Sequence, residues 1–251
     1  NLLTISAAPA TPTITWPSPA PLVYGQPLSA TQLSAATEEV IPGTFSYVPP
    51  IGTVLNAGTD QLLTVTFTPT VVIDSMIAFV PVGDPNNPPF IQSDPLGNEV
   101  PYGAVAEPFE IGKYEITNER YTAFLNAVAS DDPITASQFA PPPPLYNINM
   151  ANEARGGIVR SGTAPNFAYT TKPKMEDKPV LFVSFWDACR FCNWLHNGMP
   201  QGAQDTTTTE DGAYDLTDAD SILSNTVVRK PDARYFIPNE DEWYKAAHYD
   251  P

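Results

Sequence analysis

A change of pattern near residue 76 constrains this chain more than any other feature of its sequence. Before residue 76, TITW and LTVTFTPT alternate apolar and polar side chains over β-branched positions, which is typical of half-buried strands. Turn-forming stretches such as YGQP, IPGT and NAG separate these segments. After residue 76, amphipathic helices are predicted among irregular segments. The chain is therefore expected to contain an all-β unit followed by a unit of mixed α and β structure.

Three helices are predicted in the second unit from N-cap residues and apolar periodicity. Thr117 is expected to cap the first helix and Ser184, with Asp187, the second. Asn239 and Glu242 predict a capping box for the third helix. The apolar faces expected for the first and third helices consist of Tyr121, Phe124, Leu125 and Val128, and of Trp243, Ala246 and Ala247.

Two segments of unusual composition are predicted to be surface loops. The chain has 29 prolines in 251 residues, which favours turns and short strands over long helices. Four of these prolines follow one another in APPPPLYN, residues 140–147. Residues 205–221 are rich in threonine and acidic side chains.

The net negative charge of the chain argues against polyanionic binding partners. The formal net charge is −16 and the sequence pI is near 4.2. Nucleic acids and anionic membrane surfaces attract basic patches, so neither is expected as a partner. The sequence has no run of about 18 apolar residues, so no transmembrane segment is expected.

The first unit resembles a bacterial immunoglobulin-like repeat of the kind found in large secreted and surface proteins. The resemblance rests on the stretch from TPTITW to LTVTFTPT, and it implies a β-sandwich over residues 11–75 that acts as a spacer or adhesive module. An extracellular or cell-surface location is therefore expected. Because the chain starts with NLLTIS rather than Met, we also expect it to be a section of a longer secreted protein.

The position of NLLTISA suggests a displaced strand. In arrays of such repeats a last strand follows FTPT, but here FTPT runs directly into VVIDSMIAFVPVGD. Residues 1–10 are therefore predicted to be a strand that completes the open sandwich of a neighbouring copy, with Leu3 and Ile5 pointing inward. Such a contact is heterologous and generates a filament unless the rotation closes.

Five motifs of the second unit occur in an order that resembles the N-terminal portion of the formylglycine-generating enzyme (sulfatase-modifying factor) family. They are FEIGKYEITNERYTAFLNAVA, ARGGIVRSG, KPVLFVSFWDACRFCNWLHNG, TEDGAYDLT and FIPNEDEWYKAAHYDP. The resemblance implies a C-type-lectin-like α+β fold over residues 76–251. The predicted fold class is thus a multidomain, β-rich protein: an immunoglobulin-like β-sandwich followed by a partial formylglycine-generating-enzyme-like domain.

The same resemblance implies which chemistry to look for. Enzymes of the family oxidise a substrate cysteine to formylglycine with O₂ and with copper held by two cysteines. Relatives include non-haem iron sulfoxide synthases and ligand-binding proteins. The copper-binding cysteines and the calcium ligands of the enzymes lie beyond the EWYKAA motif, in a C-terminal half that is missing here. We therefore expect no catalytic residue, no cofactor and no metal ligand in this chain.

Cys189 and Cys192 form a C-x-x-C pair on the predicted second helix. Free cysteine behaves as a small apolar residue when buried, so filling of the core is the favoured interpretation. An intrahelical disulfide and a redox or metal site remain as alternatives. A low-pKa thiolate would need a place at the helix N-terminus, and Cys189 lies beyond the first turn.

The remaining candidate residues have ordinary structural explanations. His196 and His248 each close a predicted helix, where a favourable interaction with the helix dipole is preferred to a role as general base. Asp84, Asn86 and Asn87, like Asp215, Asp218 and Asp220, offer oxygen ligands for Ca²⁺ but match no complete loop signature. Core packing is favoured over a ligand surface for the aromatic set Trp186, Trp194, Trp243, Tyr244 and Tyr249.

Three functions remain in competition. The leading hypothesis is a secreted or cell-surface structural protein that self-associates into a filament by β-strand addition. The first alternative is a fragment of a copper- and O₂-dependent formylglycine-generating-type oxidase. The second is a lectin-like module on an immunoglobulin-like stalk, with a glycan or a peptide as its ligand.

Overall fold

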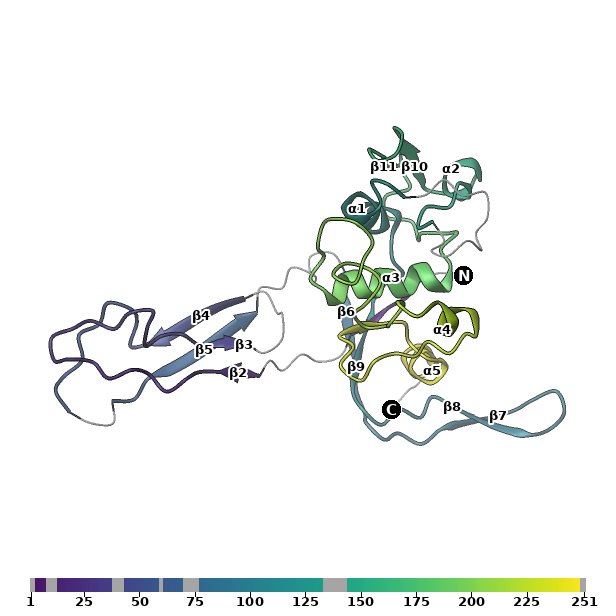
Figure 1. Cartoon of the computed structure of the whole chain (residues 1–251). Helices are drawn as coiled ribbons and strands as arrows, with labels where there is room; N and C mark the ends of the chain where they lie inside the picture. Colours follow the sequence, from purple (N-terminus) through teal and green to yellow (C-terminus); the bar gives the residue numbers. More distant parts are fainter. Residues whose placement is uncertain are drawn as a thin grey trace. The chain divides into compact units, whose positions relative to one another are not determined.

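The structure is a computed structural model that describes residues 3–7, 13–37, 43–58, 61–69, 77–132 and 144–248. It divides into two compact units (Figure 1). One unit is Ala10–Ser75, and the other combines Asn1–Pro9 with Met76–Pro251. We call the second of these the mixed unit. The first unit is therefore inserted, in sequence, between two parts of the mixed unit.

The unit Ala10–Ser75 is built from short antiparallel strands. β2 (Ile14–Thr15) pairs with β3 (Ala36–Thr37), and β4 (Gly43–Val48) pairs with β5 (Thr64–Pro69). Its core contains Leu28 and Leu33 together with an edge-to-face contact between the rings of Trp16 and Tyr47, whose centroids lie 5.5 Å apart. These strands agree with the all-β prediction, and the immunoglobulin-like sandwich itself stays a prediction.

A four-stranded antiparallel sheet forms the centre of the mixed unit. Its spatial order is β12–β1–β9–β6. The strands are β1 (Ser6–Ala7), β6 (Phe79–Val82), β9 (Phe109–Gly112) and β12 (Tyr235–Phe236). Two hairpins lie outside this sheet: β7 (Phe90–Ser93) with β8 (Glu99–Tyr102), and β10 (Ile158–Ser161) with β11 (Ala168–Thr171).

The three predicted helices are present with their caps. They are α1 (Asn118–Val128), α3 (Phe185–His196) and α5 (Glu240–His248), and two short helices are α2 (Asn149–Asn152) and α4 (Ala219–Leu223). The Thr117 side chain accepts a hydrogen bond from the Arg120 N–H, and Ser184 and Asp187 form a reciprocal capping box. Asn239 and Glu242 do the same at α5. These local sequence signals were therefore sufficient to place the helix starts.

Helix α3 is the core element of the mixed unit. Figure 1 shows it crossing the middle of this unit, and nine consecutive residues from Asp187 to Leu195 are buried. Its Phe191 and Trp194 rings pack on Phe124 of α1 with centroids 5.3 and 5.2 Å away. All four residues predicted for the apolar face of α1 are buried, so that prediction is confirmed.

The prediction that residues 205–221 form a surface loop was wrong for much of this segment. Thr209 and Ala213 are fully buried, and Tyr214 and Leu216 are each 4% exposed. The reason is that the loop meets polar partners on α3. The Arg190 guanidinium donates to both Glu210 carboxylate oxygens at 2.7 and 2.9 Å. A polar sequence is buried here because its hydrogen-bonding groups are satisfied.

The proline-rich segment is only partly described. Residues 140–143 lie outside the described residues, but Leu145 and Tyr146 are buried. Their backbone N–H groups donate to the two carboxylate oxygens of Asp132, at 2.9 and 3.0 Å. The end of this segment is thus anchored in the mixed unit rather than lying on its surface.

The N-terminal strand occupies a different place from the one predicted. β1 lies within its own chain, between β9 and β12, with Ser6 opposite Ile111 and Phe236. Leu3, Ile5 and Ala7 are at most 6% exposed. Ser6, which lies between Ile5 and Ala7, is also fully buried, and both edges of the strand are paired. Leu3 and Ile5 thus pack within their own chain, and the expectation that they complete a neighbour's immunoglobulin-like sandwich stays a prediction.

No helix in the described part of the chain is long and apolar enough to cross a membrane.

Replacing Ile5 with alanine is expected to destabilise the mixed unit, although Ile5 lies more than 70 residues before the rest of that unit in sequence. Ile5 is fully buried, and truncation of such a side chain to alanine costs about 2–5 kcal/mol. Urea unfolding followed by tryptophan fluorescence measures the change. Val23→Ala is the matched control, because Val23 is 75% exposed in the other unit. Equal stability of Ile5→Ala and the wild type would contradict the position of β1.

Candidate functional site

Helix α5 separates two clefts of the mixed unit. The first, which we call the Trp243 cleft, has a volume of about 280 Å³. The second, the Tyr244 cleft, has a volume of about 320 Å³. Trp243, Ala246 and Ala247 face the first cleft, and Tyr244, Lys245 and His248 face the second. Both are of the small size that accommodates a side chain or a single ring.

Two buried charged residues hold α5 in place. Glu242 is 5% exposed and Lys245 is 1% exposed. The Arg229 guanidinium donates to the Glu242 carboxylate at 2.8 Å, and the Lys245 ammonium donates to the Asp84 carbonyl oxygen at 2.6 Å. The apolar stripe predicted for α5 was therefore assigned to the wrong face: Trp243 is 49% exposed. Because their charges have partners, Glu242 and Lys245 take the inward positions.

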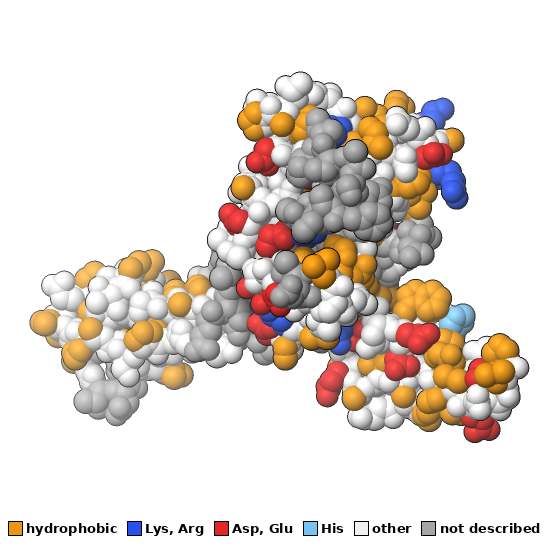
Figure 2. All heavy atoms as spheres, turned by 45° about the vertical axis from the view of Figure 1, so that its right-hand side comes forward, with side chains coloured by type: hydrophobic (Ala, Val, Ile, Leu, Met, Phe, Trp, Pro, Cys, Tyr) orange, Lys and Arg blue, Asp and Glu red, His pale blue; other side chains and the backbone are white. Residues whose placement is uncertain are grey.

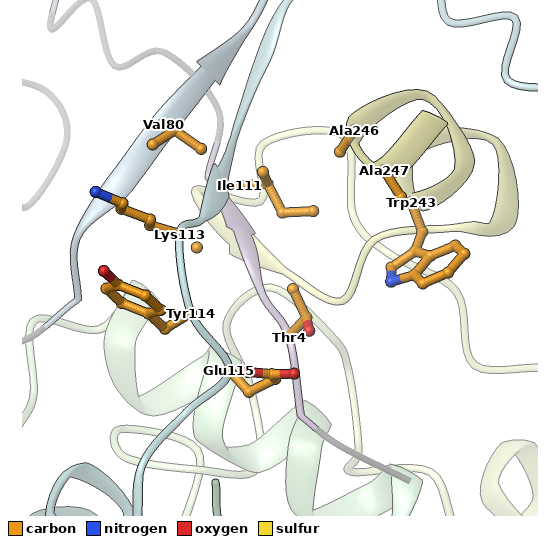
Figure 3. Close-up of a pocket in the computed structure, with 10 residues that line it drawn as sticks. Thr4, Val80, Ile111, Lys113, Tyr114, Glu115, Trp243, Ala246 and Ala247 are labelled. Carbon is orange, nitrogen blue, oxygen red and sulfur yellow. The ribbon is translucent and has the colours of Figure 1, made fainter. Parts of the chain in front are cut away.

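The Trp243 cleft is an open groove over the central sheet (Figure 3). Trp243 of α5 stands on one side, and Tyr114, just after β9, lies on the other side of the Thr4 backbone. Tyr114 is 65% exposed. Thr4, Ile111 and Val80 contribute from the sheet strands or their ends. Two exposed aromatic rings that flank an apolar floor are typical of a recognition surface.

Opposite charges lie beside these rings. Lys113 and Glu115 both line the Trp243 cleft, and the Lys113 ammonium lies 5.6 Å from the centroid of the Tyr114 ring. The cleft thus offers a hydrogen-bond donor and an acceptor together with apolar contact area. Ala246 and Ala247 add little bulk, so the space next to Trp243 stays open.

The Tyr244 cleft is dominated by stacked rings. The Tyr244 ring stacks against the rings of Phe90 and Tyr102, with centroids 5.7 and 5.5 Å away. A Cβ atom on Gly103 would come within 2.9 Å of the Tyr244 ring, so glycine permits this close packing. The Gly103 N–H also donates to Asp241 of α5 at 2.8 Å. These contacts attach the β7–β8 hairpin to α5, and hydrophobic side chains reach the surface on this hairpin at the lower right of Figure 2.

Cys189 and Cys192 are core residues. Both are free and fully buried. Burial raises the pKa of Cys189 to about 12 and the pKa of Cys192 well above its usual value. Copper binding requires thiolates, so this pair does not fit the two-cysteine copper site that the family resemblance implies. Among the described residues, no group of three or more His, Cys, Asp or Glu side chains is placed to hold a metal ion.

The two histidines differ in burial: His196 is partly buried, and His248 is exposed. The His196 Nδ1 atom accepts a hydrogen bond from the Arg234 N–H at 3.2 Å. Burial, followed by the charge of Arg234, lowers the pKa of His196. His196 is therefore neutral near pH 7, rather than a cation interacting with the helix dipole. His248 is exposed and its ring contacts those of Trp243 and Tyr244.

The oxygen-rich candidates are engaged in turns. The Asn87 side chain donates to the carbonyl of Gly103 and accepts from the N–H of Val105. Asp215 accepts from both the N–H and the hydroxyl of Thr217. Asp218 accepts from the Ser221 hydroxyl, while Asp84 and Asn86 have positive φ angles of 54° and 61°. The side chain of Asp220 lies outside the described residues. These interactions agree with the interpretation of both segments as turns.

The predicted aromatic set divides between core and surface. Trp194 is 3% exposed and its indole N–H donates to the Pro200 carbonyl at 2.9 Å. Trp186 stacks edge-to-face on Phe185, and Tyr249 lies outside the described residues. Trp243 and Tyr244 line the two clefts, contrary to the preference for core packing. Sequence reasoning missed Tyr114 and Thr4, because neither lies in a pattern that distinguishes a cleft from an ordinary surface.

Comparison with known proteins identifies the mixed unit. A family model described as the sulfatase-modifying factor enzyme 1-like domain matches residues 87–249. This match covers more than half of the chain and confirms the resemblance of the second unit. No curated protein and no solved structure matches the chain.

Both native thiols are expected to resist thiol–disulfide exchange with Ellman's reagent in the folded protein at about pH 8, since burial disfavours the thiolate. Labelling with Ellman's reagent, with and without guanidinium chloride, measures this. In denaturant both thiols should react at the rate of free cysteine. Val23→Cys, at a position that is 75% exposed, supplies a matched reactive thiol. Rapid labelling of native Cys189 or Cys192 would contradict the core assignment.

Asp187→Asn is expected to reduce the pH dependence of stability. Burial raises the pKa of Asp187 from its ordinary value of 3.8 to about 6. Between these values the folded protein binds a proton that the unfolded chain has released, so the free energy of unfolding falls as the pH rises. Asparagine does not ionise and keeps an oxygen for the Ser184 N–H. As the pH rises from about 4 to about 6, the free energy of unfolding of the variant should increase relative to that of the wild type, by at most about 3 kcal/mol.

Urea unfolding at several pH values between about pH 4 and pH 7 measures this difference. Asp131→Asn is the control, because Asp131 is exposed. A constant difference between Asp187→Asn and the wild type over that range would contradict the raised pKa.

Proposed function

Because this chain belongs to the sulfatase-modifying factor enzyme 1-like family, we propose that its mixed unit binds a segment of polypeptide in the Trp243 cleft. The observation that carries this proposal is the pair of exposed rings, Trp243 and Tyr114, on either side of a floor formed by sheet residues (Figure 3). Enzymes of the family act on a cysteine within a polypeptide, so a peptide is the ligand class that family membership favours.

The chemistry of the cleft suits an apolar side chain in an extended peptide. Trp243 is 49% exposed and Tyr114 is 65% exposed, so both rings can lose solvent contact when a ligand binds. Burial of apolar area contributes about 25 cal/mol per Å², and aromatic residues at the centre of an interface commonly dominate the binding energy. A volume of about 280 Å³ limits the anchor to one or two side chains.

Lys113 and Glu115 would orient the bound segment. An ammonium donates to a peptide carbonyl, and a carboxylate accepts from a peptide N–H. The two charges are of opposite sign, so the cleft itself does not select a strongly charged ligand. The net charge of −16 disfavours acidic peptides in the approach to the surface.

Family membership also favours a second candidate, the oxidation of a cysteine in the bound polypeptide to formylglycine. Cys189 and Cys192 do not fit the copper ligands of that reaction, so this candidate requires reacting groups other than those two thiols. Copper-dependent O₂ consumption in the presence of a cysteine-containing peptide is its test. Peptide binding in the Trp243 cleft is common to both candidates.

The structural hypothesis and the extracellular location stay predictions. Within this chain β1 lies in the central sheet of the mixed unit, and its addition to a neighbour's immunoglobulin-like sandwich stays a prediction as well.

Trp243→Ala is expected to weaken peptide binding at least tenfold. Because half of the Trp243 side chain is solvent-exposed, its loss should remove binding area without unfolding the unit. Peptides are selected from a random display library on the wild-type protein, synthesised with a fluorophore, and titrated by fluorescence anisotropy. Tyr24→Ala is the matched control, since Tyr24 is an exposed aromatic residue of the other unit.

Two results would contradict the proposal. One is selection of peptides that bind wild type and Trp243→Ala equally. The other is a glycan array with strong hits that Trp243→Ala abolishes, when the library gives none. The second result would assign the cleft to carbohydrate.

A further inference from the structure

The central sheet of the mixed unit contains one strand, β1, that is separated from the rest of the unit in sequence. β1 lies between β9 and β12, and β12 is joined to the sheet through β1. The Gly112 N–H donates to the Ile5 carbonyl at 2.9 Å, and the Ile116 N–H donates to the Leu3 carbonyl at 2.8 Å. The slot between β9 and β12 therefore accepts a strand on two edges.

Side chains of the strand fit this slot with a clear pattern. Leu3, Ile5 and Ala7 are 6%, 0% and 5% exposed, respectively. Strand addition of this kind takes its affinity from main-chain hydrogen bonds and its specificity from alternate side chains. Ser6 is fully buried as well, so the slot is a recognition site for an extended segment with small or aliphatic residues at positions 3, 5, 6 and 7.

The segment that connects β1 to the rest of the mixed unit is long and contains a folded unit of its own. A whole compact unit, Ala10–Ser75, separates the strand from the remainder of the mixed unit in sequence. Strand insertion therefore resembles the binding of a tethered ligand, whose effective concentration is in the millimolar range at best for a short flexible linker and lower for a long one. Residues 3–7 of a second copy have the same side chains and can therefore make the same contacts in the slot between β9 and β12.

One polar group of the strand is buried without a hydrogen-bond partner in the described part of the chain. The Ser6 hydroxyl oxygen is buried and has no hydrogen-bond partner among the described residues. A buried hydroxyl without a partner costs about 1–3 kcal/mol. This cost lowers the strength with which the slot holds the strand, and it is the same whether the strand comes from its own chain or from a second copy.

We propose that residues 3–7 exchange between copies of this chain, so that the strand of one copy fills the slot between β9 and β12 of another. Reciprocal exchange gives a closed dimer, and one-way exchange extends into a chain of copies. Thr4 lines the Trp243 cleft, so an exchanged strand also contributes a residue to the partner's cleft.

A disulfide trap in the full chain distinguishes the two arrangements. Ala7 is paired with Glu110 in the sheet, and antiparallel partners have Cα atoms about 4.5–5.5 Å apart, within the range for a disulfide. The variant Ala7→Cys/Glu110→Cys is incubated at several protein concentrations, oxidised, and separated on a non-reducing gel. Exchange predicts interchain products whose ratio to intrachain links rises about tenfold for each tenfold increase in concentration, until it saturates.

Val159→Cys/Thr170→Cys is the matched control. These residues are partners in the β10–β11 hairpin, whose strands are close in sequence, so this pair should give intrachain links at every concentration. Intrachain links alone from the Ala7/Glu110 pair would overturn the proposal. Equal amounts of interchain product from both pairs would also overturn it, because such products arise by random oxidation.

A second measurement uses the wild-type sequence without introduced cysteines, in case the cysteine variant fails to fold. Two copies that carry tags of different mass are mixed and followed by native mass spectrometry. Mixed dimers or longer species that an excess of a synthetic peptide of residues 1–9 dissociates support the proposal, and their absence at high concentration overturns it. Neither readout depends on peptide binding, so failure here leaves the Trp243 cleft to be judged by its own experiment.

Discussion

The buried polar side chains of α3 are the interaction on which the rest of the mixed unit depends. The Arg190–Glu210 ion pair and the Asn193 amide hold the loop that follows the helix. The Asn193 side chain donates to the carbonyls of Thr209 and Tyr214 and accepts from the Tyr214 N–H. A buried ion pair adds little net stability compared with apolar packing, but removal of one partner is costly. Its main effect here is to fix where the loop lies.

The position of α5 follows from that loop through a series of contacts. The Tyr214 hydroxyl accepts from the Ile237 N–H at 3.0 Å, directly after β12. Tyr214 also forms a β-bridge with Arg229, and Arg229 holds Glu242 of α5. The two clefts on either side of α5 thus depend on polar groups that begin in the core of α3. This arrangement explains how a unit with so few long strands and helices positions exposed rings in a defined way.

The N-terminal strand joins two parts of the chain that a linear domain order would separate. Because β1 belongs to the central sheet, the Ala10–Ser75 unit is an insertion, in sequence, between strands of the mixed unit. The same strand brings Thr4 to the Trp243 cleft. β1 therefore affects both the stability of the central sheet and the shape of the Trp243 cleft.

The sequence by itself determined the local structure and the family. Thr117, Ser184 and Asn239 could be identified as helix caps because each satisfies backbone groups a few residues away. Cys189 and Cys192 could be assigned to the core because their spacing places them on one helix face beyond the first turn. Only the tertiary structure decided the place of Leu3 and Ile5, the outward orientation of Trp243, and the burial of Thr208, Thr209, Ala213, Tyr214 and Leu216. Each of these depends on partners distant in sequence, such as β9 and β12 for the strand and Arg229 for Glu242, and no local pattern encodes such partners.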